Sequence, residues 1–227
     1  MRLEEQFDMA LVLHGFRFSV YVRVARIALG EKGLTYEHIE IDPFLPNVPP
    51  EYLDLHPFGR VPALEDGEFV LYETGAITRY IDEAFPGPTL QPTVPRHRAR
   101  MAQVISIVDS YGYTSMVRQV AGERVFARFR GRTPDETLIR TGLERSLRVL
   151  DALETITPGG SPIAGGNIWS LADFHLAPMM AYFTAAPEGA EALARYTKLS
   201  AWWAVTRERK SLKDTDPGLR EMPASAA

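Results

Sequence analysis

Glu73 and Thr74 stand together at the start of a predicted helix, where their side chains suit the free end of an amino acid. Thr74 is expected to be the N-cap of this helix, with its hydroxyl accepting from a backbone N–H. The unpaired amides of the first turn attract a carboxylate, and the Glu73 carboxylate attracts an ammonium. The pair therefore predicts a site for an α-amino-acid terminus. A plain helix cap beside a solvated glutamate is the more frequent arrangement of such a pair.

Val61, Pro62 and Ser19 are further candidates for contacts with a bound peptide. Pro62 opens a predicted strand, where a residue without an N–H is tolerated. If the Val61–Pro62 bond is cis, Val61 presents its N–H and C=O outward to an extended peptide, whereas trans is the ordinary state. Ser19 stands where a strand turns into a helix, so its hydroxyl either caps the helix or donates to a nearby anion. Both alternatives stay open at both positions.

Other kinds of catalytic site are not indicated. The chain contains no cysteine, which excludes disulfides, thiolate zinc sites and chemistry at a thiol of the protein. Neither a nucleophile elbow, a P-loop nor a dinucleotide glycine fingerprint is present. Ser170 to Asp173 predicts a helix capping box, a structural feature. The histidines show no metal-ligand spacing, so no metal is expected and most are predicted to be structural; they are His14, His38, His56, His97 and His175.

The first third of the chain predicts the alternating strands and helices that would position these residues. Gly33 ends the first helix, and Asp66-Gly67 is a hairpin signal between two short strands. A strand, a helix and a strand in this order form a right-handed parallel crossover. The predicted strands are 9–13, 36–41, 62–64 and 69–72, and the predicted helices begin at 19 and cover 50–55 and 74–84.

Residues 86–95 hold four prolines in ten residues, which predicts an extended linker. Beyond them the apolar periodicity is purely helical. The predicted helices cover 96–120, 134–156, 170–184, 188–196 and 198–209. The sequence therefore predicts an α/β domain at 1–86, a linker at 87–95 and an all-helical domain at 96–227.

Composition restricts the partners of the protein. The 227 residues carry a net charge of −4, which argues against a basic nucleic-acid-binding surface. No apolar run approaches the roughly 18 residues of a membrane span. The acidic residues Glu4, Glu5 and Asp8 are unlike a signal peptide. We therefore expect a cytoplasmic protein that binds neither nucleic acid nor membranes.

Two segments resemble the cytosolic glutathione transferase superfamily. They are HPFGRVPALEDGEFVLYETGAITRYIDEAFP (56–86) and WSLADFHLAP (169–178), and with the linker the resemblance covers nearly the whole chain. The specific part is Gly-Arg-Val-Pro-Ala-Leu, whose proline is followed eleven residues later by Glu-Thr-Gly-Ala-Ile. The resemblance implies a thioredoxin-like N-terminal domain that holds glutathione as co-substrate. An all-α C-terminal domain would supply most of the second-substrate site.

The resemblance also implies residue roles. Val61 would pair with the cysteinyl backbone of glutathione beside a cis Pro62, and Glu73 and Thr74 would hold the γ-glutamyl end. Ser19 matches the serine of theta-, zeta- and phi-like enzymes, which donates a hydrogen bond to the glutathione sulfur. A free thiol with a pKa of about 8.5 is mostly protonated at neutral pH, so this donor favours the attacking thiolate.

The second-substrate pocket is expected where Gly15 and Phe16 face the long helix after the linker, with Val108, Tyr111 and Tyr113 as candidates on that helix. An apolar stripe with tyrosines is more often core.

Three departures from the family pattern bear on this prediction. Thr74 stands where many members have serine, which keeps the hydroxyl. Asn47 and Val48 replace the His and Lys of phi-like relatives, so we expect cationic contacts to the glycyl carboxylate to be lost, with Arg60 as a partial substitute. The segment Ser-Val-Tyr-Val (19–22) stands where zeta-like isomerases have Ser-Ser-Cys-Ser, which argues against a maleylacetoacetate isomerase. The lack of cysteine argues against the thiol-transferring omega and beta classes.

The leading functional prediction is transfer of glutathione to an electrophilic small molecule. The alternatives are a non-catalytic glutathione-binding or regulatory protein with the same fold, and a specialised glutathione-dependent dehalogenase or etherase. The resemblance also implies a homodimer, for which the apolar side chains of Phe44, Leu45 and Phe58 are candidate anchors.

Overall fold

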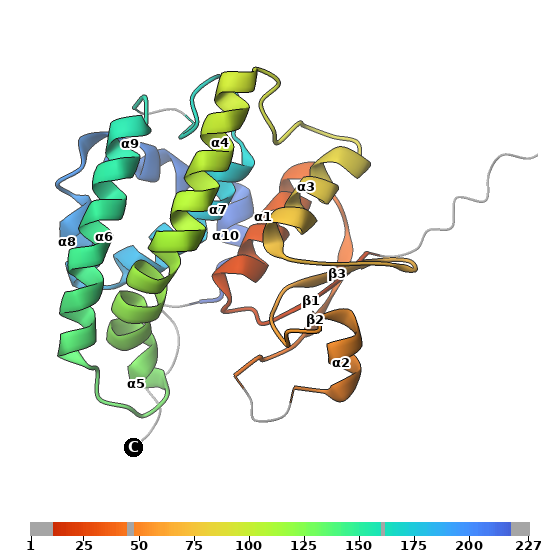
Figure 1. The fold of residues 1–227 in the computed structure, drawn as a ribbon, viewed down its shortest axis with the longest axis horizontal. Helices are drawn as coiled ribbons and strands as arrows, with labels where there is room; N and C mark the ends of the chain where they lie inside the picture. The colour runs from red at the N-terminus through yellow and green to blue at the C-terminus, as the bar shows by residue number, and fades with distance from the viewer. Residues whose placement is uncertain (1–10, 45–47, 160–161, 219–227) are drawn as a thin grey trace, which may run out of the picture. The chain divides into compact units, whose positions relative to one another are not determined.

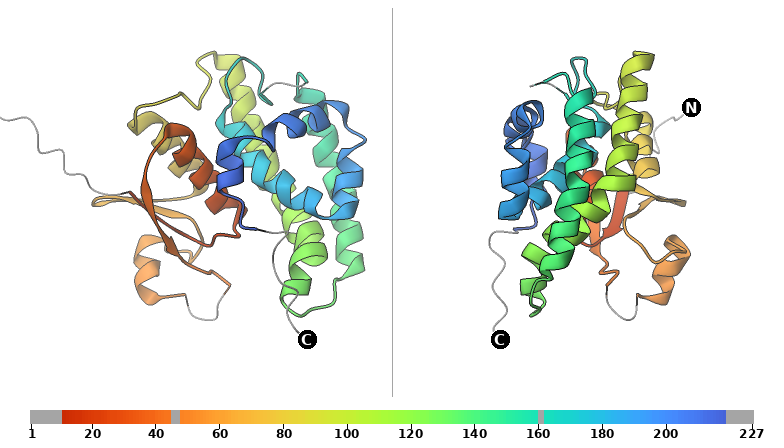
Figure 2. Two further views of the ribbon diagram at one scale, coloured as in Figure 1. Left: turned by 180° about the vertical axis from the view of Figure 1, so that it is seen from behind. Right: turned by 60° about the vertical axis from the view of Figure 1, so that its left-hand side comes forward.

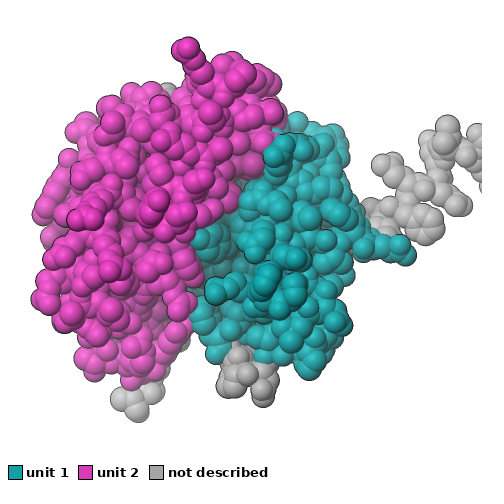
Figure 3. All heavy atoms as spheres, in the orientation of Figure 1, with its two compact units in different colours: residues 1–88 teal, residues 89–227 magenta. Residues whose placement is uncertain are grey.

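The computed structural model describes residues 11–44, 48–159 and 162–218. The chain divides into two compact units, Met1–Pro88 and Thr89–Ala227, coloured separately in Figure 3. The first unit combines a four-stranded sheet with helices, whereas in the described residues of the second unit helices are the only regular elements. This confirms the predicted fold class, a thioredoxin-like α/β domain followed by an all-α domain.

The sheet of the first unit has the strand order β2-β1-β3-β4. Strand β1 runs parallel to β2 and antiparallel to β3, and β3 forms an antiparallel hairpin with β4. Helices α1 and α3 pack against each other on one face, and α2 lies on the other face (Figure 1). The elements are β1 (Leu11–Gly15), α1 (Val20–Lys32), β2 (Tyr36–Glu40), α2 (Pro50–Leu55), β3 (Ala63–Asp66), β4 (Phe69–Tyr72) and α3 (Thr74–Ala84).

Most of these bounds follow from local signals in the sequence. Gly33 ends α1 with a left-handed φ of 71°, and the hairpin turns at Gly67 with a φ of 63°. The helices predicted at 50–55 and 74–84 match α2 and α3. The helix predicted to begin at 19 and the strand predicted to begin at 62 each begin one residue later, as α1 and β3. The predicted first strand began at Met9, which lies outside the described residues; the described strand continues beyond Leu13 to Gly15.

The second unit contains one long helical rod, against which the helices at 136–156 and 171–185 pack. The rod consists of α4 (Pro95–Ile107), η1 (Val108–Phe126), which has the wider π-helical pattern, and α5 (Ala127–Phe129). It runs about nine residues beyond the predicted end at 120. The remaining helices are α6 (Glu136–Ile156), α7 (Leu171–Ala185), α8 (Pro187–Leu193), α9 (Thr197–Thr206) and α10 (Lys210–Asp214), the last of which was not predicted.

Helices η1 and α6 lie side by side in both views of Figure 2. Gly142 permits this close approach, because a Cβ at that position would come within 2.9 Å of the Ser115 carbonyl oxygen. This contact joins residues far apart in the chain, so the helical periodicity alone did not predict it.

The predicted capping box at the start of α7 is confirmed, and its carboxylate is a buried centre of hydrogen bonds. The Ser170 N–H donates to Asp173 Oδ2 at 2.8 Å. Asp173 Oδ1 accepts from the Ile163 N–H at 2.8 Å and from Trp202 Nε1 at 2.9 Å. Burial raises the pKa of Asp173, while these donors act in the opposite direction. The residue therefore joins three segments of the helical unit.

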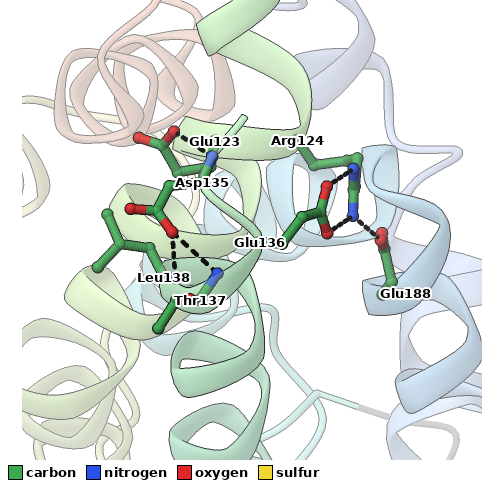
Figure 4. A network of polar contacts seen from close by, with 7 residues as sticks. All are labelled: Glu123, Arg124, Asp135, Glu136, Thr137, Leu138 and Glu188. Atoms are coloured by element: carbon green, nitrogen blue, oxygen red, sulfur yellow. Dashed lines mark hydrogen bonds and ion pairs between the residues drawn. The ribbon is translucent and has the colours of Figure 1, made fainter. Parts of the chain in front are cut away.

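A second polar cluster fixes the connection between α5 and α6 (Figure 4). Glu123 accepts from Arg132 Nη2 at 3.0 Å and from the Asp135 N–H at 3.1 Å. Next to it, Arg124 binds Glu136 through both terminal nitrogens, at 2.9 and 2.8 Å, and pairs with Glu188. The cluster joins η1, α6 and α8.

Replacing Glu123 with glutamine should lower the free energy of unfolding near neutral pH by about 1–2 kcal/mol. The hydrogen bond from Arg132 holds the pKa of Glu123 below its usual value. A lowered pKa in the folded state stabilises the protein above the ordinary carboxyl pKa of about 4.3. The difference between Glu123→Gln and the unsubstituted protein should therefore vanish as the pH falls through the lowered pKa.

Urea unfolding over a series of pH values measures this difference. Glu144→Gln is the matched control, because Glu144 is an exposed glutamate on α6. A difference that persisted unchanged into acid would show that the carboxylate charge is not the stabilising group.

Candidate functional site

The sheet topology brings the predicted site residues of the first unit to one end of the sheet. In the strand register His14 pairs with Ala63, and Ala63 pairs with Tyr72. The end of β1, the start of β3 and the end of β4 therefore lie next to one another. The segments that continue from these positions carry Ser19, Val61–Pro62 and Glu73–Thr74.

Ser19 is the N-cap of α1, which is one of the two roles predicted for it. Its backbone is extended, and its Oγ accepts from the Val22 N–H at 3.4 Å. A serine hydroxyl has one proton to donate in addition to its acceptor lone pairs. Capping uses a lone pair, so the proton remains available to an anion near the positive end of α1. The two roles that the sequence left as alternatives are therefore compatible.

The Val61–Pro62 peptide bond is cis. Strand β3 begins only at Ala63, so the main chain of Val61 lies outside the sheet ladder. Within the part of the chain that the structure describes, the Val61 N–H and C=O have no hydrogen-bond partner. An extended peptide could use both groups in the manner of an added strand.

Glu73, rather than Thr74, precedes the first residue of α3, so the expected N-cap at Thr74 is wrong. The Glu73 carbonyl already accepts from the Ile77 N–H at 3.0 Å, which starts the helix one residue earlier. Glu73 has a φ of 72°, the only positive φ of a non-glycine residue among those described. Such a backbone costs about 1–3 kcal/mol and is typical of functional sites.

The side chains of Glu73 and Thr74 remain available to a ligand. Glu73 is exposed, and Thr74 is buried in the first turn of α3. Among the described residues, neither the Glu73 carboxylate nor the Thr74 hydroxyl makes a hydrogen bond. An acceptor beside a helix start still suits an α-amino-acid terminus, although Thr74 does not cap the helix.

His56 lies close to this end of the sheet and was not among the predicted site residues. It is 2% exposed, and its ring centroid lies 4.9 Å from that of Tyr72. Burial lowers the pKa of His56, the Glu73 charge raises it, and the Arg60 charge lowers it again. Because burial is the largest of these effects, the net shift favours the neutral ring.

Arg60 is exposed and has no ion pair among the described residues. It directly precedes Val61, and its expected contact with a ligand carboxylate stays a prediction. Val48 is half-buried and offers no charge there. Asn47 lies outside the described residues.

The residues predicted for the second-substrate pocket belong to different units. In the first unit, a Cβ at Gly15 would meet Val22 at 2.4 Å, so this glycine allows β1 and α1 to approach closely. Phe16 is half-buried and lies against the Phe44 ring, with 6.0 Å between centroids. In the second unit, Val108 is fully buried, Tyr113 is half-buried and Tyr111 is 67% exposed. Their shared pocket remains a prediction.

Two other features are lacking in the described residues. No group of three or more His, Cys, Asp or Glu side chains is placed to hold a metal ion there. Within the same residues, no helix has the length and apolar character needed to cross a membrane.

Comparison with known proteins matches each unit to a family. Residues 13–89 match "Glutathione S-transferase, N-terminal domain", and residues 123–204 match "Glutathione S-transferase, C-terminal domain". Glutathione S-transferase F9 of Arabidopsis thaliana is 31% identical over 210 residues, which is 91% of this chain and 96% of the relative.

Solved structures show the same similarity. The apo structure of a glutathione S-transferase III has a TM-score of 0.80 at 26% identity, covering 96% of this chain and 99% of its own. A glutathione S-transferase I bound to lactoylglutathione has a TM-score of 0.76 at 26% identity, covering 91% of this chain and 98% of its own.

Proposed function

The chain belongs to the glutathione S-transferase family and is a glutathione transferase, and we propose that it activates the glutathione thiol at Ser19 for attack on an electrophilic small molecule. The observation that carries this proposal is the convergence of Ser19, Val61 and Glu73 at one end of the sheet. Each of the three offers a group that has no competing hydrogen bond among the described residues: the Ser19 hydroxyl proton, the Val61 N–H and C=O, and the Glu73 carboxylate.

Glutathione fits this arrangement part by part. Its γ-glutamyl end carries an ammonium for Glu73 and a carboxylate for the start of α3 near Thr74. Its cysteinyl N–H and C=O pair with Val61 beside the cis Pro62, and Arg60 takes the glycyl carboxylate. With the tripeptide so held, the sulfur lies toward Ser19 at the positive end of α1. The thiol releases its proton to solvent, and the resulting thiolate attacks the electrophile. In a substitution the leaving group departs with its electron pair, and in an addition to an enone the electron pair moves to the α-carbon, which takes up a proton.

A thiol-consumption assay against a panel of electrophiles, with glutathione affinity measured beside it, tests the function. Turnover of an activated aryl halide or an enone supports conjugation. Glutathione binding without any turnover favours the regulatory alternative. Release of halide ion or ether cleavage as the selective reaction favours the specialised enzymes, which share the same first step.

We expect the protein to be a homodimer, as its resemblance to the family implies. Phe44 and Phe58 are 49% and 69% exposed within one chain, so both are available as anchors. Leu45, the third candidate, lies outside the described residues. Sedimentation at micromolar concentration should give a mass of two chains, and Phe58→Ser should shift it toward one. A monomer in the unsubstituted protein contradicts the expectation.

A further inference from the structure

We propose that Tyr52 is a positioning residue for glutathione, acting through the peptide group that joins Arg60 to Val61. The inference rests on the proposed function, and Tyr52 was not among the predicted site residues. Tyr52 lies in α2, eight residues before Arg60, and is not expected to touch the ligand.

The Tyr52 hydroxyl holds one atom of the segment that leads into β3. It donates to the Arg60 carbonyl oxygen at 2.6 Å. The side chain is 2% exposed, and its ring lies 6.1 Å from that of His14 and 6.3 Å from that of His56, measured between centroids. Burial raises the pKa of Tyr52 well above its ordinary value, so the hydroxyl keeps its proton and remains a donor.

The Arg60 carbonyl and the Val61 N–H belong to the same peptide group. A peptide group is planar, and in its trans form the C=O and N–H bonds point in opposite directions. Fixing the carbonyl oxygen on Tyr52 therefore fixes the direction of the Val61 N–H. A hydrogen bond accepted by the carbonyl also polarises the peptide group and strengthens its N–H as a donor.

The Val61 N–H is the donor proposed to bind the cysteinyl carbonyl of glutathione. It lies outside the sheet ladder, so no strand partner fixes its direction. The contact from Tyr52 supplies this constraint from the face of the sheet that carries α2. The hydroxyl thus prepares a donor for the ligand without touching it.

Tyr80 provides a matched control within the same unit. Its hydroxyl donates to Asp66 Oδ2, also at 2.6 Å. Asp66 pairs with Phe69 at the hairpin turn, the end of the strands opposite Ala63 and Tyr72. Tyr80→Phe therefore removes an equally short tyrosine hydrogen bond away from the proposed site.

The test compares Tyr52→Phe with Tyr80→Phe by calorimetric titration with glutathione. The Tyr52 hydrogen bond orients one donor to glutathione, so Tyr52→Phe should lower the affinity for glutathione about three- to tenfold. Tyr80→Phe should leave this affinity unchanged. The KM for glutathione should rise more than kcat falls, because the contact acts on the peptide backbone of the ligand and not on its sulfur. Unchanged affinity in a folded Tyr52→Phe overturns the inference.

A second ligand separates positioning from general damage. γ-Glutamylcysteamine keeps the γ-glutamyl end and the thiol but lacks the cysteinyl carbonyl. The affinity loss in Tyr52→Phe should appear with glutathione and be absent with this analogue. An equal loss for both ligands overturns the inference, since it shows a disturbed site as a whole.

Two further outcomes are distinguishable. If the unsubstituted protein binds no glutathione, the proposed function fails, and this inference fails with it. If Tyr52→Phe does not fold, amide NMR of the unsubstituted protein decides: the Val61 proton should move downfield with glutathione but not with γ-glutamylcysteamine. A Val61 amide that responds equally to both ligands overturns the inference.

Discussion

Ser19→Ala should raise the pKa of enzyme-bound glutathione by about 1–2 units toward its free value, because a hydrogen bond to a charged acceptor contributes about 1.5–3 kcal/mol. The Ser19 proton is not needed for capping, so it is free to donate to the sulfur. This bond strengthens as the sulfur gains charge, so its loss affects the thiolate more than the thiol. Conjugation at neutral pH should fall by about ten- to a hundredfold, while glutathione affinity changes little.

Ultraviolet absorbance of the thiolate, titrated against pH in the two proteins, measures the shift. Ser19→Thr is the matched control, because threonine keeps both the cap and the hydroxyl proton. The loss of the cap alone lowers the free energy of unfolding by about 0.5–2 kcal/mol and leaves the thiol pKa unmoved. An ordinary thiol pKa in the unsubstituted protein would show that it binds glutathione without activating it.

Glu73→Ala should weaken glutathione binding by about 1.5–3 kcal/mol, or roughly ten- to 150-fold, because it removes a charged acceptor for the γ-glutamyl ammonium. Glu73→Gln keeps the size and shape of the side chain and removes only its charge. This variant should lose most of the same affinity for glutathione. Calorimetry with both variants gives the comparison. Unchanged affinity in Glu73→Ala would place the γ-glutamyl end elsewhere.

Glu73→Gly should separate binding from stability. The φ of 72° is strained for glutamate and unstrained for glycine. Relief of this strain exceeds the greater entropy loss of glycine on folding, so the free energy of unfolding should rise by about 1 kcal/mol. Affinity should fall as in Glu73→Ala. A less stable Glu73→Gly variant would show that the left-handed backbone at this residue carries no strain.

The sequence by itself determined those parts of the protein that depend on neighbouring residues. Helix α1 ends at Gly33 and the hairpin turns at Gly67 because each position needs a backbone that glycine adopts freely. The capping box likewise depends on two residues close together in the chain, Ser170 and Asp173. The motif around Val61–Pro62 and Glu73–Thr74 predicted the family, and the comparisons confirm it.

Only the tertiary structure decided how distant segments meet. The strand register brings Ser19, Val61 and Glu73 to one end of the sheet. The N-cap of α3 is Glu73 instead of the expected Thr74. The close approach at Gly142 likewise depends on a partner far along the chain. Tyr52 acquires its contact with Arg60 only because a helix and a loop fold against each other. Local propensity fixes turns and caps, whereas these contacts depend on packing and pairing between segments, which sequence spacing does not encode.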